Sequence, residues 1–362
     1  MAGSGSTDDM GPFQAVCDWS NLLAAHRVAA RGKRGRASAA AFEHRLTDRL
    51  LAIQQALQTR TWQPGGYRHF TVHEPKRRRI SAAPFGDRVV HHALCRQMLP
   101  LFEPHFWPHS YANRVGGGTH RAIAQAQAWL RGHGWVLRCD VRQHFPSIDH
   151  ALLRAKIARR IHDDGVLWLV DTLLTGGASA LADEWTPVYF PGDDLFALER
   201  PRGLPIGNLT SQFWSNLYLN DFDWFVVREL GCSAYLRYVD DFALFSHSKA
   251  QLRDWRQRLI DRLARERLLL HEQQAQVVPT WQGMPWLGFV LYPNRRHLKQ
   301  RKVLNFSRRY RALVADYRAG RCSFAELSAH VHGWIAHARH GHTEALRAQL
   351  FRRWPVRDSG PD

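Results

Sequence analysis

The sequence predicts an α+β fold in which short strands carry polar site residues and long amphipathic helices cover them. Two apolar runs of strand length lead to aspartates, one at residue 140 and one at residues 240–241. Other long segments repeat their apolar residues every three or four positions, which is helical spacing. A composition of 45% hydrophobic and 23% charged residues is that of a globular chain and excludes a wholly disordered one.

The elements of the first half follow from local patterns. Residues 1–12 are small and polar, and we expect a loose tail. Residues 19–60 are expected to be helical, with Ser38 capping a run of apolar residues at helical spacing: Phe42, Leu46, Leu50, Ile53 and Leu57. Strands are expected within residues 67–82 around a basic turn at 76–79. Two further helices are expected, over residues 84–103 and 119–131.

The second half alternates strands and helices. A buried strand over residues 134–139 should run into Asp140, and a hairpin should carry Asp240 and Asp241 at its tip. A loop-rich insertion is expected at 176–202 and a strand at 286–292. Helices are expected over four other stretches: residues 151–175, 207–229, 249–268 and, as two helices, 323–354. Residues 295–318 hold nine basic residues and one acid.

The charge is strongly positive. Lysine plus arginine number 50 against 32 for aspartate plus glutamate, a net charge of +18, and only six of the 50 are lysine. Arginine suits bidentate contact with phosphate and stacking on bases. The excess predicts a polyanionic partner, with nucleic acid the first candidate and a membrane surface the second. It disfavours a housekeeping enzyme for small neutral substrates.

The cysteines and the start of the chain predict a reducing, cytoplasmic setting. The five cysteines are scattered and lack a CxxC pair, so they indicate neither a disulfide framework nor a zinc ribbon. The first residues show no secretory signal. We find no apolar run of the roughly 18 residues that a spanning helix needs.

The run Tyr238-Val239-Asp240-Asp241 is the strongest local signal. Adjacent carboxylates at a hairpin tip repel each other, and aspartate is a weak strand former. A divalent cation such as Mg²⁺, which binds carboxylate and phosphate oxygens, would remove the conflict. The alternative is a type I′ turn that happens to hold two aspartates.

A second signal is Asp140, delivered to the C-terminal end of an apolar strand, with Phe145 five positions later. A nucleotidyl transferase needs carboxylates from separate chain segments to hold two metal ions about 3.5–4 Å apart. Asp140 and the 240–241 pair can meet this need if their strands are neighbours. The alternative is an aspartate that only caps the next turn.

A third signal is the segment 202–212, in which Gly and Pro set a turn and polar residues open a helix. Free N–H groups at a helix start attract phosphate, although an ordinary helix start is the alternative. Three other polar clusters are weaker metal candidates: Asp193-Asp194, the histidines His337, His340 and His342, and His91-His92 with Cys95.

In this order the three signals resemble motifs A, B and C of the reverse transcriptase family. The resemblance extends to 75–80 with Asp87-Arg88, to 110–118, and to Trp286-Leu287-Gly288, and it covers roughly residues 65 to 350. It implies a right-hand polymerase with fingers, a palm of antiparallel sheet plus helices, and a helical thumb. The implied organisation is a basic helical extension at 1–64, fingers and palm at 65–290, and a basic thumb at 291–362.

The resemblance also implies roles. Asp140, Asp240 and Asp241 would be catalytic and, with the backbone of Val141, would bind two Mg²⁺ ions, for which Mn²⁺ could substitute. Phe145 would exclude a 2′-hydroxyl, and Trp286, Leu287 and Gly288 would position the primer end. Nucleotide contacts are implied for Lys76, Arg78, Phe145, Ile206, Gly207 and Gln212. Contacts with the primer–template duplex are implied for Arg295, Arg296, Lys299, Arg301, Lys302, Arg308 and Arg309.

Within the family, the run from Ile206 to Gln212 resembles the diversity-generating retroelement branch, as does 335–338. That branch implies a bacterial or phage-encoded enzyme that takes dNTPs and makes adenine-mutagenised cDNA from a template-repeat RNA. It also implies a small basic accessory protein, the accessory variability determinant. Gln274 stands where the family usually has a lysine, so either His271 or another basic residue substitutes as general acid, or the enzyme is slow.

Two alternatives remain open. One is a reverse transcriptase of an antiphage-defence or group II intron-like system without targeted mutagenesis. The other is a non-catalytic RNA-binding scaffold, which the three aspartates disfavour and Gln274 favours.

Overall fold

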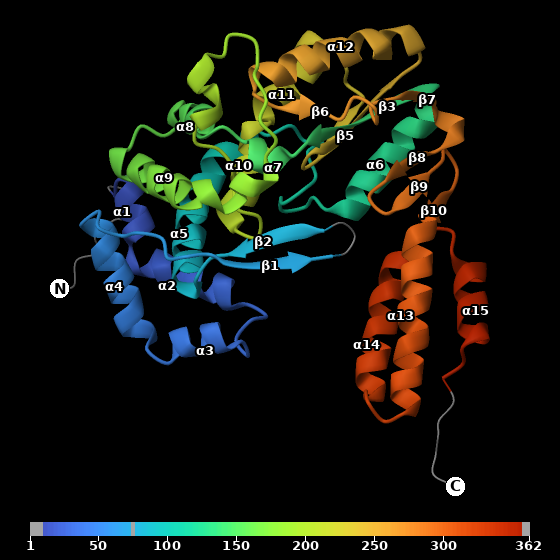
Figure 1. Cartoon of the computed structure of the whole chain (residues 1–362), viewed down its shortest axis with the longest axis horizontal. Helices are drawn as coiled ribbons and strands as arrows, with labels where there is room; N and C mark the ends of the chain where they lie inside the picture. Colours follow the sequence, from blue (N-terminus) through green and yellow to red (C-terminus); the bar gives the residue numbers. More distant parts are fainter. Residues whose placement is uncertain (1–9, 74–76, 357–362) are drawn as a thin grey trace, which may run out of the picture. The chain divides into compact units, whose positions relative to one another are not determined.

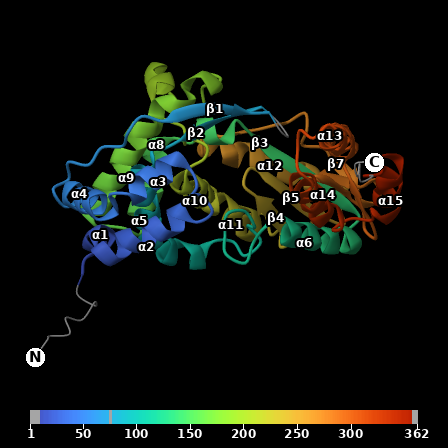
Figure 2. The same cartoon turned by 90° about the horizontal axis from the view of Figure 1, so that it is seen from below.

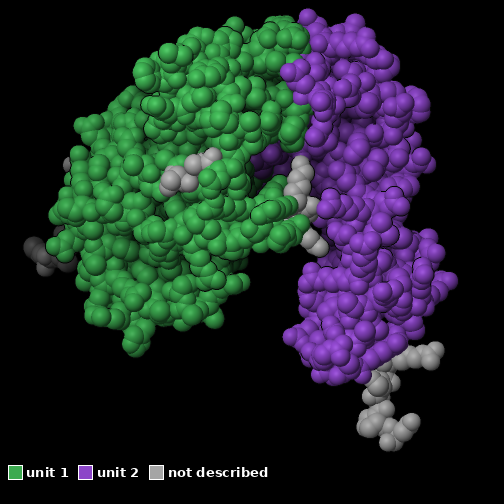
Figure 3. Space-filling model, in the orientation of Figure 1, with its two compact units in different colours: residues 1–113, 140–233, 257–271 green, residues 114–139, 234–256, 272–362 purple. Residues whose placement is uncertain are grey.

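The computed structural model describes residues 10–73 and 77–356. It mixes helices and strands (Figure 1), which confirms the predicted α+β class. The chain divides into two compact units, coloured separately in Figure 3. Unit 1 holds the described residues up to Asn113, then Asp140–Ser233 and Gln257–His271. Unit 2 holds Arg114–Cys139, Ala234–Arg256 and the described residues from Glu272 onwards.

The N-terminal part of unit 1 is helical, but in pieces. The helices are α1 (Pro12–Cys17), α2 (Trp19–Ala30), α3 (Ala37–Glu43) and α4 (Leu46–Gln58). The break after α2 contains Gly32 at φ 68°, a left-handed conformation that ends helical pairing. The predicted cap at Ser38 is wrong, because the alanine-rich segment already starts α3 at Ala37, while α4 has Arg45 at its N-cap.

Next come β1 (Arg68–Val72) and β2 (Arg78–Ala82), an antiparallel pair in which Arg68 faces Ala82. Helix α5 (Phe85–Phe102) follows, as predicted, and a 3₁₀ turn η2 (Glu103–His105) ends it. Helices α2 and α10 pack against α5, so α5 is central to unit 1 (Figures 1 and 2).

The helix predicted over 151–175 is two helices, α8 (His150–Ala158) and α9 (Asp164–Gly177). The break is set by Asp163, whose carboxylate accepts the Val166 N–H at 2.9 Å and starts the second helix. The insertion contains two 3₁₀ segments, η3 (Ala178–Glu184) and η4 (Leu195–Glu199).

The helix predicted over 207–229 is also divided. It consists of α10 (Leu209–Tyr218), α11 (Asn220–Trp224) and a π-helical turn η5 (Phe225–Glu229). Gly207 lies before the helix at φ 115°, and Asn208 is the N-cap. The aromatic residues of this stretch are largely internal, with Phe213, Tyr218 and Phe222 buried.

The main sheet contains β3 (Trp135–Arg142), β4 (Tyr235–Tyr238), β5 (Asp241–Ser246), β6 (Leu269–Leu270) and β7 (Val277–Pro279). In unit 2, β4, β5 and β3 are successive neighbours and β7 also pairs with β3. In unit 1, Val141 and Arg142 pair with β6. Because of that pairing, β3 continues past Asp140, which corrects the prediction that Asp140 ends the strand.

Helices α6 (Thr119–Gly132) and α12 (Lys249–Arg265) agree with prediction. After a 3₁₀ turn η6 (Thr280–Gln282), unit 2 has a second antiparallel sheet of β8 (Met284–Trp286), β9 (Phe289–Leu291) and β10 (Arg296–Leu298). The single strand predicted over 286–292 is therefore wrong. Leu287 and Gly288, at φ 43° and 93°, form a two-residue turn because positive φ at both positions favours a tight hairpin.

Unit 2 ends in three helices, α13 (Gln300–Arg318), α14 (Phe324–Ala338) and α15 (Glu344–Arg353) (Figure 1). Their common core consists of Phe306, Tyr310, Val314, Leu327 and Leu350. Ser323 and Glu326 form a capping box at the start of α14. Within the described residues, we find no helix with the length and apolarity required to traverse a bilayer.

Candidate active site

Asp140 lies in the middle of hydrogen-bonded strand structure and is only 8% exposed. The His271 N–H donates to its carbonyl oxygen at 2.9 Å, and His271 Nε2 lies 3.9 Å from its Oδ2. Val141 is buried opposite Leu270. The predicted substitute for the family lysine is therefore adjacent to a predicted catalytic carboxylate, whereas Gln274 is exposed in the turn after β6.

Gln143 links the end of β3 to the insertion, a role that the sequence analysis missed. It adopts a left-handed conformation (φ 46°, ψ 43°) before the short helix α7 (His144–Ser147). Its amide Nε2 donates to the Glu184 carbonyl at 2.6 Å, and its Oε1 accepts the Thr186 N–H at 3.1 Å. Phe145 follows in α7, half-buried. No sequence pattern marks a left-handed glutamine, so only tertiary structure reveals this clamp.

The glycine-rich turn is hydrogen-bonded to two other predicted motifs. The Leu204 N–H donates to the Phe145 carbonyl at 2.9 Å, and the Ser81 N–H donates to the Ile206 carbonyl at 2.9 Å. Gly207 has positive φ, and a Cβ there would lie 2.9 Å from Ile80 Cγ2, so only glycine fits. These contacts connect the strand that carries Arg78, the helix that carries Phe145 and the turn of Ile206 and Gly207.

Asn208 strengthens this connection and was also missed as a site residue. Its Nδ2 donates to the Ser81 and Pro205 carbonyls, each at 3.2 Å. Farther along α10, Gln212 is half-buried. Arg78 is exposed at the start of β2, and Lys76 lies outside the described residues.

The Tyr-Val-Asp-Asp run forms a tight hairpin in unit 2. Tyr238 pairs with Asp241 across the turn, so Val239 and Asp240 are its two central residues and Asp241 begins β5. Val239 has φ 60°, which is a rare conformation for a β-branched residue. Such strain persists only where surrounding contacts hold it, and it is concentrated at functional sites.

An ion pair holds the hairpin against β3. Arg138 Nη2 donates to Asp241 Oδ1, and each side chain is about a quarter exposed. Arg138 precedes Asp140 by two residues in the same strand. The sequence analysis did not assign a role to Arg138, although a cation within an otherwise apolar strand was a usable signal.

The donor chemistry of Asp140, Asp240 and Asp241 suits a hard divalent cation, because such ions prefer carboxylate oxygens. Val141 could add only a backbone carbonyl. Across residues 10–73 and 77–356, no three His, Cys, Asp or Glu residues are gathered in a ready-made metal site. A cation at Asp241 would have to share this carboxylate with Arg138.

The predicted primer-grip residues differ in exposure. The Trp286 side chain is completely buried in unit 2, while Leu287 and Gly288 are half-exposed at the hairpin turn. The Lys299 N–H donates to the Gly288 carbonyl at 3.0 Å. Any direct contact with a bound nucleic-acid strand would therefore come from the turn, and the buried indole ring would support the turn from the interior of unit 2.

The predicted duplex-binding residues also divide into two kinds. On α13, four basic side chains are exposed: Arg301, Lys302, Arg308 and Arg309. Arg295 is exposed beside β10, with its guanidinium 4.7 Å from the centre of the Tyr292 ring, and Lys299 is half-buried at the N-cap of α13. Arg296 is held inward because its Nε donates to Gln127 Oε1 at 2.5 Å. Burial, with the nearby charge of Arg131, lowers the pKa of Arg296.

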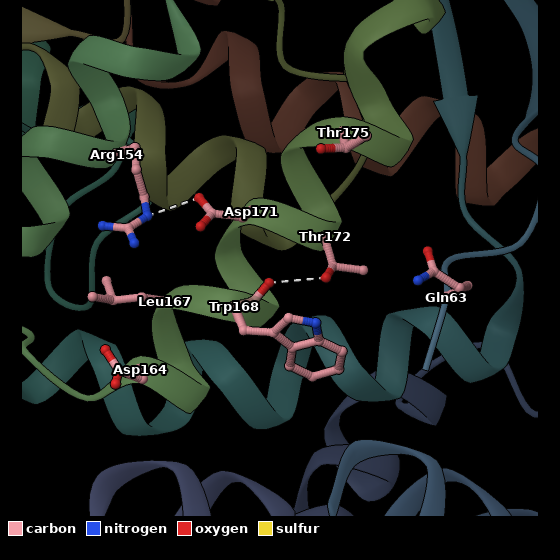
Figure 4. Close-up of a pocket in the computed structure, with 8 residues that line it drawn as sticks. All are labelled: Gln63, Arg154, Asp164, Leu167, Trp168, Asp171, Thr172 and Thr175. Carbon is pink, nitrogen blue, oxygen red and sulfur yellow. Dashed lines mark hydrogen bonds and ion pairs between the residues drawn. The ribbon is translucent and has the colours of Figure 1, made fainter. Parts of the chain in front are cut away.

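The weaker candidates have structural partners. Asp193 pairs with Arg200 and accepts the Phe190 N–H, so it holds the insertion loop together. His340 stacks on His120 with ring centres 3.4 Å apart. A hollow along α9, shown in Figure 4, contains none of the predicted site residues, and its Arg154 and Asp171 are paired at 2.7 Å.

Comparison with known proteins adds a family match. The family described as "Reverse transcriptase (RNA-dependent DNA polymerase)" matches residues 72–291, more than half of the chain. Protein YkfC of Escherichia coli (strain K12) is 25% identical over 268 residues, which are 64% of this chain and 67% of that protein.

Group II intron-encoded protein LtrA of Lactococcus lactis subsp. cremoris is 24% identical over 184 residues, 50% of this chain and 28% of that protein. Nuclear intron maturase 1, mitochondrial, of Arabidopsis thaliana is 29% identical over 90 residues, 25% of this chain and 13% of that protein. The chain thus spans well under a third of these two relatives. Among solved structures, an apo telomerase from Candida tropicalis, truncated from its C-terminal domain, has a TM-score of 0.46 at 11% identity, covering 65% of this chain and 55% of that one.

Proposed function

We propose that this chain, which belongs to the reverse transcriptase (RNA-dependent DNA polymerase) family, extends a primer on an RNA template using dNTPs. The family match confirms the predicted enzyme class, an RNA-directed DNA polymerase. The matched region, residues 72–291, includes Asp140 and the Tyr-Val-Asp-Asp run. The observation that carries the proposal is the ion pair between Arg138 and Asp241, because it fixes the acidic hairpin tip to the part of strand β3 that belongs to unit 2.

The right-hand architecture is part of the proposal. We assign β1 and β2 to the fingers, the sheet around β3 and β5 to the palm, and α13 to α15 to the thumb. The corresponding boundaries are 1–64 for the extension, 65–290 for fingers and palm, and 291–362 for the thumb. The short β1–β2 pair, in which β1 is exposed along its whole length, and the separate core of the last three helices support this division.

Reverse transcriptases generally use divalent metal ions, and we propose Mg²⁺ held by Asp140, Asp240 and Asp241 with the Val141 carbonyl. When bound, such ions would activate the primer 3′-hydroxyl and neutralise charge that develops on the α-phosphate and the leaving pyrophosphate. The chain itself would keep these carboxylates in place, through β3 for Asp140 and through Arg138 for Asp241.

Nucleotide selection would depend on the hydrogen-bonded motifs of unit 1. The Phe145 ring would exclude a ribose 2′-hydroxyl, and its position is supported by the bond between the Leu204 N–H and the Phe145 carbonyl. Arg78 would hold the triphosphate through bidentate contacts, and Lys76 would add a single positive charge. Gly207 would let the backbone approach the nucleotide, and Ile206 and Gln212 would flank it.

We further propose the diversity-generating retroelement branch, on the run Ile206–Gln212. Ile206 is apolar, whereas the family usually has a polar side chain at this position. We expect Ile206 to discriminate less strongly against base pairs of incorrect geometry than that polar side chain would. This function would require a template-repeat RNA and a small basic accessory protein. A group II intron-like role without targeted mutagenesis is the second candidate, because Lactococcus LtrA, by its name, is encoded by such an intron.

Primer extension on an adenine-rich RNA template tests both levels of the proposal. Mg²⁺-dependent cDNA with frequent errors at adenines would support the retroelement branch. Accurate cDNA would support the intron-like alternative and remove the mutagenic one. Tight RNA binding without any product, in the presence and absence of candidate accessory proteins, would contradict the polymerase function itself.

A further inference from the structure

Unit 1 carries a basic surface that lies outside the polymerase motifs except at one residue, Arg88, which belongs to the motif at 75–80 with Asp87-Arg88. We define it as Arg31, Lys33 and Arg36, from the segment between α2 and α3, together with Arg88 and Arg96 of α5. All but Arg88 are exposed, and Arg88 is half-buried. We propose that this surface binds the phosphate backbone of RNA outside the stretch being copied. The inference rests on the proposed function only in taking RNA as the polyanion.

The two segments of this surface are electrostatic neighbours. Arg88, His92 and Arg96 recur every four residues and therefore share one face of α5. Burial, followed by the charges of Lys33 and Arg96, lowers the pKa of His92 to about 4. Burial and the charge of Arg36 lower the pKa of Arg88. The loop between α2 and α3 thus brings its cations to the cations of α5, and α3 itself packs against α5 (Figure 2).

These cations lack acidic partners. No ion pair joins Arg31, Lys33, Arg36, Arg88 or Arg96 to any residue that the structure describes. Glu43, the acid nearest in sequence to the loop cations, pairs with Arg34 at 3.3 Å, and Asp87, which precedes Arg88, accepts the Gly65 N–H at 2.8 Å. Like charges that are brought together without counter-charges destabilise the folded state. A bound polyanion would relieve that repulsion, so its binding free energy would be more favourable here than at a surface of mixed charges.

The two arginines of α5 are already oriented. Arg96 donates through Nε to Asn21 Oδ1 at 3.1 Å, and Arg88 donates through Nε to the Ala83 carbonyl at 2.9 Å. In both, the two terminal nitrogens bond to none of the residues that the structure describes and are left for another acceptor. A guanidinium fixed in this way loses little entropy when it contacts a phosphate oxygen pair, which favours phosphate over a flexible acidic peptide.

Most of the surface is separate from the face of α5 that packs against the glycine-rich motif. His91, one residue before His92, bonds to Thr210 Oγ1 of α10 at 2.6 Å, and Thr210 belongs to the glycine-rich motif. His92 and Arg96 point about 100° and about 140° away from His91 around the helix, whereas Arg88, three residues before His91, borders the face that holds α10. RNA bound through Arg96 and the cations of the loop between α2 and α3 would therefore leave the nucleotide contacts uncovered.

The test compares two triple variants that lose the same charge. The surface variant is Arg31→Gln/Lys33→Gln/Arg36→Gln, confined to the exposed loop. The control is Arg160→Gln/Arg253→Gln/Arg265→Gln, three exposed arginines without ion pairs among the described residues. Binding of a labelled mixed-sequence single-stranded RNA is measured at several salt concentrations, to the full chain already saturated with a short unlabelled primer–template.

We expect the surface variant to bind the labelled RNA about tenfold more weakly at physiological salt. A plot of the logarithm of the association constant against the logarithm of the salt concentration should have a negative slope that is smaller in magnitude by about 2, because three phosphate contacts are lost. The control variant should keep the wild-type affinity and slope. Arg96→Lys, which keeps the charge but not the oriented fork, should weaken binding less than Arg96→Gln. Primer extension on the short hybrid should be the same in all variants.

An unchanged affinity and salt slope in the surface variant would overturn the inference, and so would an equal loss in the control. A wild-type chain that fails to extend the primer would refute the proposed polymerase while leaving the RNA-binding result readable. If the surface variant binds RNA normally but loses an acidic protein partner, the surface serves that partner and the RNA assignment is wrong.

Discussion

Arg138 donates a hydrogen bond to the Asp241 carboxylate, and this contact joins strand β3 to the tip of the β4–β5 hairpin. Both side chains are about a quarter exposed, so water screens their attraction only in part. The pair therefore controls where one of the predicted catalytic carboxylates lies.

Arg138→Gln should lower the free energy of unfolding by about 1–2 kcal/mol, because it leaves a partly buried carboxylate without its cation. Arg138→Lys keeps the charge and should retain most of the stability. Urea denaturation measures both. The matched control is Arg154→Gln, which breaks an exposed pair with Asp171 and should cost less than about 1 kcal/mol. Equal losses at the two sites would contradict a special role for Arg138.

Asp240→Asn with Asp241→Asn should abolish Mg²⁺-dependent cDNA synthesis, since amides are poor replacements for carboxylate ligands. RNA binding, measured by fluorescence anisotropy, should be largely preserved. Asp194→Asn, in the exposed part of the insertion, serves as the control and should keep full activity. Full activity in the double variant would remove the polymerase assignment.

Phe145→Ala should increase ribonucleotide incorporation, because it removes the ring that would exclude the 2′-hydroxyl. The backbone bond from the Leu204 N–H to the residue 145 carbonyl does not depend on the side chain and should survive. The measurement is the ratio of kcat/KM for dNTP and rNTP in single-nucleotide extension. Phe196→Ala changes an exposed aromatic and provides the comparison. An unchanged ratio would place the sugar filter at another residue.

Val239→Asn should stabilise the folded chain by about 1 kcal/mol, because asparagine tolerates positive φ far better than a β-branched residue does. Thermal unfolding should show a rise in Tm. Primer extension should not rise with it, since the strained turn holds Asp240 in its position. If Tm falls instead, the valine side chain contributes packing that outweighs the backbone strain.

His91 should make the protein sensitive to acid. Its side chain is 3% exposed, and burial, followed by the charges of His92 and Arg88, lowers its pKa to about 3. The unfolded chain takes up a proton below about pH 6.5 while the folded chain does not, so stability is present above that pH and falls as the pH decreases towards 3.

In urea titrations at pH 7, 6 and 5, His91→Gln should therefore show a shallower loss of stability than the wild type, by up to about 1.4 kcal/mol per pH unit. His162→Gln, at an exposed position, should leave the pH profile unchanged. A His91→Gln profile that is parallel to that of the wild type would contradict the assignment.

The spacing of apolar residues correctly predicted those elements that bury one continuous apolar face. Helices α5, α6 and α12 agree with expectation because their apolar stripes are continuous. The stretches 151–175 and 207–229 were expected as single helices but are interrupted: Asp163 starts a second helix in the first, and the other divides after Tyr218. Within 19–60, the helical pairing ends at Gly32, which has positive φ. The turn at Leu287 and Gly288 was missed because an apolar run does not reveal where a hairpin reverses.

By itself, the sequence determined the family, because the order of three short motifs can be read from it without any knowledge of packing. It also determined the positive charge, which predicts a polyanionic partner. Only the tertiary structure decided which residues support those motifs. Arg138 and Asp241 are 103 positions apart, and Gln143 reaches the backbone of a segment some forty residues away. Such contacts form because the fold brings distant segments together, and local sequence propensities do not predict them.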